Sequence, residues 1–242
     1  MMYAKVVAVQ LINFMGYDCL FQDVDIHWYR NPLLAFQNSS SKFNDFDILL
    51  QDDGQRAIRY TPYYGNSGFY YVRHNSRTRF LFNSLLLQGD AILKSGSHQQ
   101  LLSALLADHA SWTGLRVKVL GLDGYPGGFS YHSRPGAVRK IILGQDTRAE
   151  IFHMSWTENK YDKFRYMRQM GMWHLKEECS SQKLEDIMNN THQQGTVEQD
   201  IYNLCCSPEP LISCHYRDTP STIDCSTSPP INGESSPSFW MK

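Results

Sequence analysis

Two aspartates, Asp23 and Asp25, stand one residue apart directly after a short apolar run, Cys19-Leu20-Phe21. In an extended chain, residues i and i+2 point to the same side, so the two carboxylates are expected to converge. Two like charges held close together repel unless a cation lies between them. Mg²⁺ and Mn²⁺ prefer oxygen ligands and keep positions open for substrate phosphates. The spacing therefore favours a divalent-metal site, although an ordinary acidic turn can have the same pattern.

The elements that must position this pair are a helix and a strand before it and further strands after it. Apolar residues recur at helical spacing near the N-terminus, at Ala4, Ala8, Leu11, Ile12 and Met15, and Gly16 follows them where helices commonly end. Strands are expected at residues 19–22, 47–50, 69–72 and 117–120. Helices are expected at 77–88, with Phe80, Leu81, Leu85 and Leu87 inward, and at 97–106, with Ser97 as a cap. Gln51-Asp52-Asp53-Gly54 is typical of a turn, and a site role for either aspartate stays open.

Composition excludes several classes of function. The chain has 242 residues, enough for one domain with a sizeable core, and a formal net charge of −1. Because no basic stripe is visible, nothing suggests nucleic-acid binding. The sequence has no run of 18 or more apolar residues, so no membrane-spanning helix is predicted. The N-terminal stretch does not have the pattern of a signal peptide.

The cysteines are concentrated near the C-terminus. Five of the six lie between Cys179 and Cys225, in a part that is also rich in serine and proline. This clustering favours disulfides among Cys179, Cys205, Cys206, Cys214 and Cys225, and an oxidising compartment. Zinc is the alternative, but paired Cys-x-x-Cys units are lacking. Cys19, in the apolar run, is expected to stay a free thiol.

The flanks of the aspartate pair carry a family resemblance. Residues 16–33 contain Gly-Tyr-Asp, an apolar strand, Asp-Val-Asp, an aromatic pair and Arg-Asn-Pro-Leu, and residues 66–73 read Asn-Ser-Gly-Phe-Tyr-Tyr-Val-Arg. Both blocks, in this order, resemble the nucleotide-diphospho-sugar transferase domain family, from about residue 5 to about residue 175. The resemblance implies an α/β fold with a GT-A-like mixed sheet flanked by helices. A partial transferase-like domain is expected at residues 1–178, followed by a Cys-rich, largely irregular extension at 179–242.

The resemblance also implies the rest of the site. His153 ends an apolar strand and would be the third protein ligand of Mn²⁺ (or Mg²⁺), beside Asp23 and Asp25; a half-buried histidine without a ligand role is the alternative. Lys160 or Lys163, in the helix that follows, would neutralise the donor's diphosphate.

Two further stretches are implicated more weakly. Asn66 is flanked by glycines, which permit close approach, so Asn66 and Gly68 are expected to contact the sugar; a Gly-rich hairpin entry is the alternative. His98-Gln99 stands where many relatives carry Asp-Gln, which makes both residues weak candidates for a catalytic role. A surface position for His98 is equally open.

The implied activity is metal-dependent transfer of a sugar from a nucleotide-diphosphate donor to a hydroxyl of a glycan or glycoprotein, in the Golgi or secretory lumen. A non-catalytic transferase-like module that binds a glycan or a partner protein is the alternative. A haloacid-dehalogenase-like phosphatase is disfavoured, because His27 stands where that class has Thr or Val.

The aspartate pair arrives early, at residue 23, whereas strand–helix units precede it in the family. The domain is therefore expected to be N-terminally truncated, with an open edge on the strand at 19–22 and an incomplete nucleoside pocket. Residues 1–242 alone are expected to bind nucleotide sugar weakly, to turn it over slowly or not at all, and to tend to aggregate.

Overall fold

The computed structural model describes residues 2–180, 185–186 and 204–210 and divides the chain into two compact units. The first unit contains the residues up to Ser133 together with Thr147–Trp156, and the second contains Arg134–Asp146 and the described residues from Thr157 onwards. Most of the Ser- and Pro-rich stretch, with Cys214 and Cys225, lies outside the described residues. The expected boundary between 178 and 179 stays a prediction.

The first unit is built on a four-stranded mixed sheet. Its order is β1 (Cys19–Gln22), β4 (Gly65–Val72), β3 (Ile48–Asp52) and β5 (Val117–Leu120). β4 pairs antiparallel with both β1 and β3, and β3 pairs parallel with β5. The expected α/β fold with a mixed sheet is confirmed. Within the described part of the chain, β1 pairs with β4 alone, so it is an edge strand, as expected.

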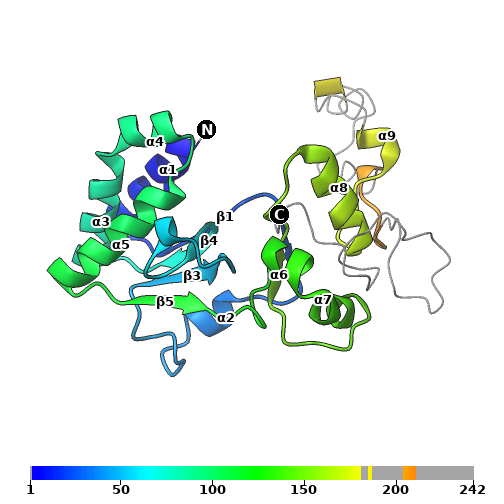
Figure 1. The fold of residues 1–242 in the computed structure, drawn as a ribbon, viewed down its shortest axis with the longest axis horizontal. Helices are drawn as coiled ribbons and strands as arrows, with labels where there is room; N and C mark the ends of the chain where they lie inside the picture. The colour runs from blue at the N-terminus through cyan, green and yellow to red at the C-terminus, as the bar shows by residue number, and fades with distance from the viewer. Residues whose placement is uncertain (1, 181–184, 187–203, 211–242) are drawn as a thin grey trace. The chain divides into compact units, whose positions relative to one another are not determined.

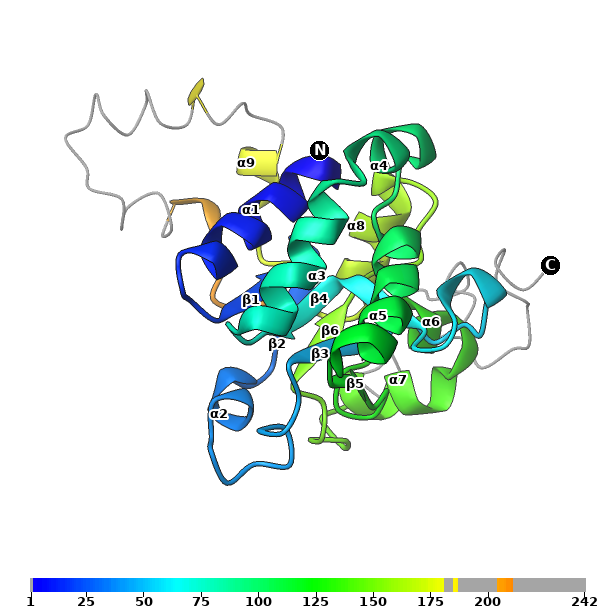
Figure 2. The same ribbon diagram turned by 90° about the vertical axis from the view of Figure 1, so that its left-hand side faces the viewer.

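Helices cover one face of this sheet, as Figures 1 and 2 show. They are α1 (Met2–Phe14), α3 (Ser76–Leu86), α4 (Gly89–Ser95) and α5 (Gln99–Thr113). Side chains alternate between the faces of a strand, so the core is divided in two by the sheet. The helical side receives Ile48, Leu50, Tyr70 and Val72. The other side receives Leu49, Phe69 and Tyr71, which pack with Phe36 of α2 (Leu33–Phe36).

A second, two-stranded sheet completes the first unit. β2 (Ile26–Trp28) pairs antiparallel with β6 (Ile151–His153), which returns from the far end of the unit's sequence. The 3₁₀ helix η1 (Ile58–Tyr60) and α6 (Gly128–Ser133) also belong to this unit. The second unit contains α7 (Pro135–Ile142), α8 (Lys160–Gln169) and α9 (Glu177–Ser180).

The buried face of α1 differs from the expected one. Val6, Val9 and Asn13 are buried, whereas Leu11 and Met15 are largely exposed. The sequence of this helix is apolar on more than one side, so it contains two stripes at helical spacing. Packing on the sheet buries the stripe with Val6 and Val9 and leaves the expected one exposed.

Two helix predictions need smaller corrections. In α3, Leu81 and Leu85 are buried as expected, but Phe80 and the cap residue Leu87, which follows the helix, are exposed. α5 begins at Gln99 and continues to Thr113, so Ser97 lies one residue before the cap position.

One disulfide among the five cysteines expected to pair is present in the second unit. Cys179 and Cys205 are bonded, with their Cα atoms 5.5 Å apart, and so do not bind zinc. Cys19 is a buried free thiol, as expected, and Cys206 is free and half-buried. Of the helices that the structure describes, none has the length and apolar character needed to cross a membrane.

Candidate metal centre

Asp23, Asp25 and His153 form one group in the first unit. Each offers one ligand atom, and these atoms all lie within 4.8 Å of one another. Asp25 and His153 are buried, and Asp23 is partly exposed. Two carboxylate oxygens and one imidazole nitrogen form a donor set that suits a divalent cation such as Mn²⁺. The group is therefore able to bind a metal ion.

The two sheets bring these residues together. Asp23 directly follows β1, and its backbone N–H donates to the carbonyl of Gly68 at 2.7 Å, which extends the β1–β4 pairing. Asp25 directly precedes β2, whose first residue, Ile26, lies opposite His153 in β6. The N–H of Met154 donates to the Asp25 carbonyl at 2.9 Å. The site thus lies at the junction of the two sheets.

The convergence of the aspartates was predicted for the wrong local reason. Asp23 to Asp25 form a turn between β1 and β2, not an extended strand, and the intervening Val24 is fully exposed. The backbone of each aspartate is anchored by one hydrogen bond, Asp23 to Gly68 of β4 and Asp25 to Met154, which directly follows β6, and the turn so held brings the two carboxylates together.

Gln51 of β3 fixes the orientation of the His153 ring. The side-chain amide of Gln51 donates through Nε2 to the carbonyls of Tyr125 and Pro126, each at 3.0 Å. Its Oε1 is therefore left as an acceptor, 2.7 Å from His153 Nδ1. With the proton on Nδ1, the lone pair of Nε2 faces Asp25 Oδ1 at 3.4 Å. Two acceptors face each other there, which is the arrangement that a cation relieves.

Gly68 gives the centre its space. A Cβ atom at this position would overlap the His153 ring and would lie 2.9 Å from Asp23 Oδ2. Any side chain here would therefore push apart two of the three ligand residues. Gly68, expected to contact the sugar, is required in any case by the close approach of β4 to the ligands.

Lys5 is a site residue that the sequence reasoning missed. Its ammonium forms an ion pair with Asp23 Oδ1, so the aspartates do have a fixed positive charge beside them. A signal was available, because Lys5 is the one charged residue in the otherwise apolar and polar-neutral α1. A metal ion bound by Asp23 would share that carboxylate with Lys5 or displace it.

A polar network adjoins the metal group. Asn66 donates to Asp53 Oδ1 at 2.8 Å and accepts from the N–H of Gly68, also at 2.8 Å. Asp53 is buried, and burial raises the pKa of its carboxyl, while hydrogen bonds from Asn66 and Gln99 oppose the shift. The expected turn at 51–54 is wrong for its first half, because β3 continues through Asp52.

His98 and Gln99 lie at the start of α5. Gln99 accepts from the N–H of Ser67 at 3.1 Å and donates to Asp53 at 3.4 Å, so it belongs to the same network. His98 is 3 % exposed, which excludes the surface position. Burial lowers the pKa of His98 to about 4, and the charge of Lys5 adds to that effect. The imidazole is therefore neutral at physiological pH, and a catalytic role for either residue stays a prediction.

The two lysines belong to the second unit. Lys160 is the first residue of α8, which Asn159 caps by accepting from the N–H of Asp162, and Lys163 lies one turn later. Their expected role at the donor's diphosphate stays a prediction.

Replacing Gln51 by Leu is expected to weaken Mn²⁺ binding about 10- to 100-fold, because the His153 ring loses the acceptor that fixes its tautomer. Calorimetric titration with Mn²⁺ measures the effect. Gln100→Leu, an exposed position in α5, is the matched control. A Gln51→Leu protein that unfolds at the parent's temperature and binds Mn²⁺ with the parent's affinity would refute the assignment.

The comparisons with known proteins agree with this geometry. Residues 1–167 match the nucleotide-diphospho-sugar transferase family. The chain is 25% identical over 181 residues to the beta-arabinofuranosyltransferase RAY1 of Arabidopsis thaliana, with 66% of this chain and 31% of that protein covered.

A second relative is the UDP-galactose:fucoside alpha-3-galactosyltransferase of Dictyostelium discoideum, 24% identical over 184 residues, with 67% of this chain and 26% of that protein covered. The chain thus spans about a third or less of the length of these relatives. No solved structure matches it. With a match across residues 1–167 and an acidic pair, a histidine and a glycine brought together at one centre, the chain belongs to the nucleotide-diphospho-sugar transferase family.

Proposed function

We propose that this chain supplies the metal and diphosphate site of a glycosyltransferase, which moves a sugar from a nucleotide-diphosphate donor to a hydroxyl of a glycan or glycoprotein. The observation that carries the proposal is the convergence of Asp23, Asp25 and His153 within 4.8 Å. Family membership points to the same class of donor. The phosphatase alternative has no support in the comparisons.

Mn²⁺ is the favoured ion, because the group includes an imidazole nitrogen beside the two carboxylates. The ion would stabilise negative charge on the leaving nucleoside diphosphate. Gln51 fixes the ring of His153 with Nε2 directed at the other ligands, and Gly68 leaves the ligands room. Lys5 supplies a further positive charge at the same place, and we propose that Lys160 or Lys163 adds another at the phosphates.

The sugar of the donor is proposed to lie against Asn66 and Gly68. The Asn66 amide nitrogen carries two hydrogens, and Asp53 accepts one of them. The other is available to a sugar hydroxyl, and neutral His98 and Gln99 are proposed as further polar contacts.

The acceptor and the compartment follow from different observations. The activities of the two relatives, arabinofuranosyl and galactosyl transfer, make a glycan hydroxyl the favoured acceptor. The Cys179–Cys205 disulfide favours the Golgi or secretory lumen, because such bonds persist in oxidising compartments.

The proposal predicts that Mn²⁺ tightens the binding of a nucleoside diphosphate at least about tenfold, since the ion bridges protein carboxylates and phosphate oxygens. UDP and GDP are titrated into the protein in Mn²⁺ and in EDTA. Transfer is then measured with UDP-galactose and with a UDP-arabinofuranose donor. Equal binding in Mn²⁺ and in EDTA would refute the metal-dependent site, and glycan binding without any nucleotide effect would indicate a non-catalytic module.

A further inference from the structure

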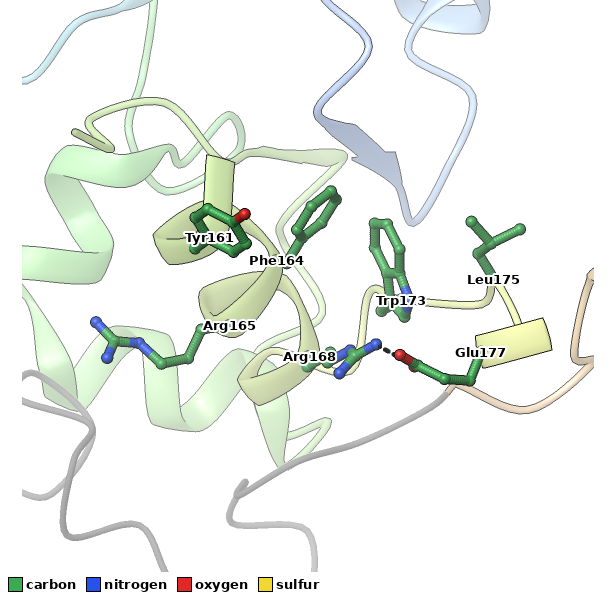
Figure 3. Close-up of a pocket in the computed structure, with 7 residues that line it drawn as sticks. All are labelled: Tyr161, Phe164, Arg165, Arg168, Trp173, Leu175 and Glu177. Carbon is green, nitrogen blue, oxygen red and sulfur yellow. Dashed lines mark hydrogen bonds and ion pairs between the residues drawn. The ribbon is translucent and has the colours of Figure 1, made fainter. Parts of the chain in front are cut away.

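The second unit contains a pocket of about 440 Å³ that the metal centre does not use. It is lined by Tyr161, Phe164, Arg165, Arg168, Trp173, Leu175 and Glu177 (Figure 3). The first four come from α8, Trp173 and Leu175 from the segment after it, and Glu177 from the start of α9. A volume of this size is within the range of small-ligand sites.

Aromatic rings form one part of the lining. The rings of Phe164 and Trp173 meet edge to face, with centroids 4.8 Å apart, and Figure 3 shows them side by side. Tyr161 is 83% exposed and Phe164 is 41% exposed. Aromatic rings are large apolar surfaces that proteins usually bury, so rings left open at a pocket provide a platform on which a flat apolar face can stack.

The charged residues of the pocket are already paired. Arg168 forms an ion pair with Glu177 at 2.9 Å, and its guanidinium carbon lies 5.9 Å from the Trp173 ring centroid. Arg165 pairs with Asp162 at 2.9 Å. Among the described residues, each arginine of the lining is thus paired with one carboxylate, which weakens its attraction for a phosphate or a carboxylate. The paired groups still offer N–H donors and carboxylate acceptors at the edge of the aromatic platform.

We propose that this pocket binds a neutral sugar residue. A sugar ring has an apolar C–H face, which packs on aromatic rings, and a rim of hydroxyls, which both donate and accept hydrogen bonds. The aromatic platform and the balanced Arg168–Glu177 pair match these two features. That the bound sugar belongs to the acceptor glycan rests on the proposed function; the binding itself does not.

The test uses the 242-residue protein in EDTA, without nucleotide, so that the metal centre takes no part. Galactose and arabinose are the neutral probes and galactose 6-phosphate is the charged one, each followed by saturation-transfer NMR. We expect the neutral sugars to bind with dissociation constants on the order of 1 mM and the phosphorylated sugar to bind no better. Absence of saturation transfer to both neutral sugars, or tighter binding of the phosphate, would overturn the proposal.

Two exposed positions allow variants that keep the fold. Tyr161→Ala is expected to weaken neutral-sugar binding about three- to tenfold, because one stacking surface is lost. Tyr17→Ala, an exposed tyrosine in the first unit, is the matched control and should bind like the parent. Equal binding by the two variants would overturn the proposal.

Glu177→Gln leaves Arg168 without its ion-pair partner. At low salt this variant is expected to bind galactose 6-phosphate more tightly than the parent does, since the pocket then has a net positive charge. An unchanged preference would contradict the charge balance on which the proposal rests. The two proposals can fail separately. If the protein binds neutral sugars in EDTA but shows no Mn²⁺-dependent nucleotide binding, the sugar pocket is supported and only the proposed function is refuted.

Discussion

Asp25→Asn is expected to lower the Mn²⁺ affinity of the protein by at least about 100-fold, more than the loss of a residue that only orients a ligand. Asp25 is 6% exposed, and it lies beside His153 in the group of three ligands. The asparagine keeps the size of the side chain but removes one of the two negative charges that attract the ion. Asp23→Asn is expected to act in the same direction, with the loss of the partner of Lys5 as an additional effect.

Calorimetry and the Mn²⁺-induced rise in melting temperature measure this effect independently. Mn²⁺ at 100 times its dissociation constant should stabilise the parent by about 2.7 kcal/mol, and the Asp25→Asn protein should show almost none of this stabilisation. Asp123→Asn is the matched control, because Asp123 is half-exposed and pairs with Arg148 away from the group. Parent-like Mn²⁺ binding by the Asp23→Asn, Asp25→Asn double variant would refute the metal centre.

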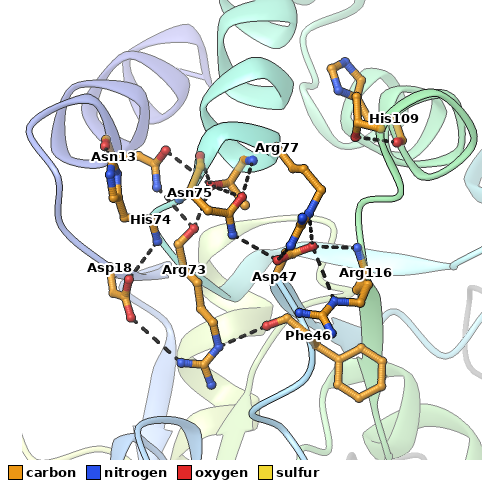
Figure 4. Close-up of polar contacts among 12 residues, drawn as sticks. Asn13, Asp18, Phe46, Asp47, Arg73, His74, Asn75, Arg77, His109 and Arg116 are labelled. Carbon is orange, nitrogen blue, oxygen red and sulfur yellow. Dashed lines mark hydrogen bonds and ion pairs between the residues drawn. The ribbon is translucent and has the colours of Figure 1, made fainter.

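Asp47→Asn is expected to lower the free energy of unfolding by about 2–3 kcal/mol, the largest stability effect that we predict. The carboxylate of Asp47 is 3 % exposed and accepts hydrogen bonds from three residues (Figure 4). Arg77 in α3 donates twice, at 2.7 and 2.8 Å, Asn75 donates from the cap of the same helix at 2.9 Å, and the N–H of Arg116 donates at 2.8 Å from just before β5. Arg77 is about one-third exposed, so water can solvate its guanidinium when the Asp47 carboxylate is removed. The expected loss of stability is therefore smaller than for a fully buried ion pair.

The same residue gives a pH dependence. Burial alone would raise the pKa of Asp47, but hydrogen bonds from Arg77 and from the Arg116 backbone, together with their charges, lower it below its ordinary value of 3.8. Since the folded pKa is the lower one, the unfolded chain takes up the proton first as the pH falls. The stabilisation is therefore complete well above pH 3.8 and is lost as the pH falls through the folded value.

Urea unfolding of the parent and of Asp47→Asn at several pH values measures both predictions. The difference between the two should be constant near pH 7 and should shrink below about pH 4. Asp45→Asn, an exposed position two residues earlier, is the control and should change the stability by less than about 0.5 kcal/mol. A difference that grew with acidification would contradict the assignment.

The identity of the ligand residues was accessible from the sequence. Asp23 and Asp25 stand out because two carboxylates one residue apart follow an apolar run, and the resemblance to the family added His153. The four strands of the larger sheet were also predictable, because short runs of apolar, β-branched or aromatic residues such as 69–72 are typical of buried strands. Local pattern sufficed for these features, since each is contained within a few neighbouring residues.

The helix faces were less predictable. α1 is apolar on several sides, so its sequence did not distinguish the Val6–Val9–Asn13 face from the Leu11–Met15 face. Only packing against α3 and the sheet decides between them, because burial depends on what lies opposite the helix and not on its own period.

The construction of the metal centre was decided by the tertiary structure alone. Gln51, which fixes the His153 ring, is 102 residues away from it in sequence. Lys5 reaches Asp23 from α1, and no local pattern in the sequence indicates this pairing. The pairing of β2 with β6 brings Asp25 beside His153, and the absence of a Cβ on Gly68 lets His153 and Asp23 approach β4. The sequence by itself determined which residues can bind a divalent ion; their meeting depends on long-range strand pairing, which no local pattern encodes because it is set by the packing of the whole unit.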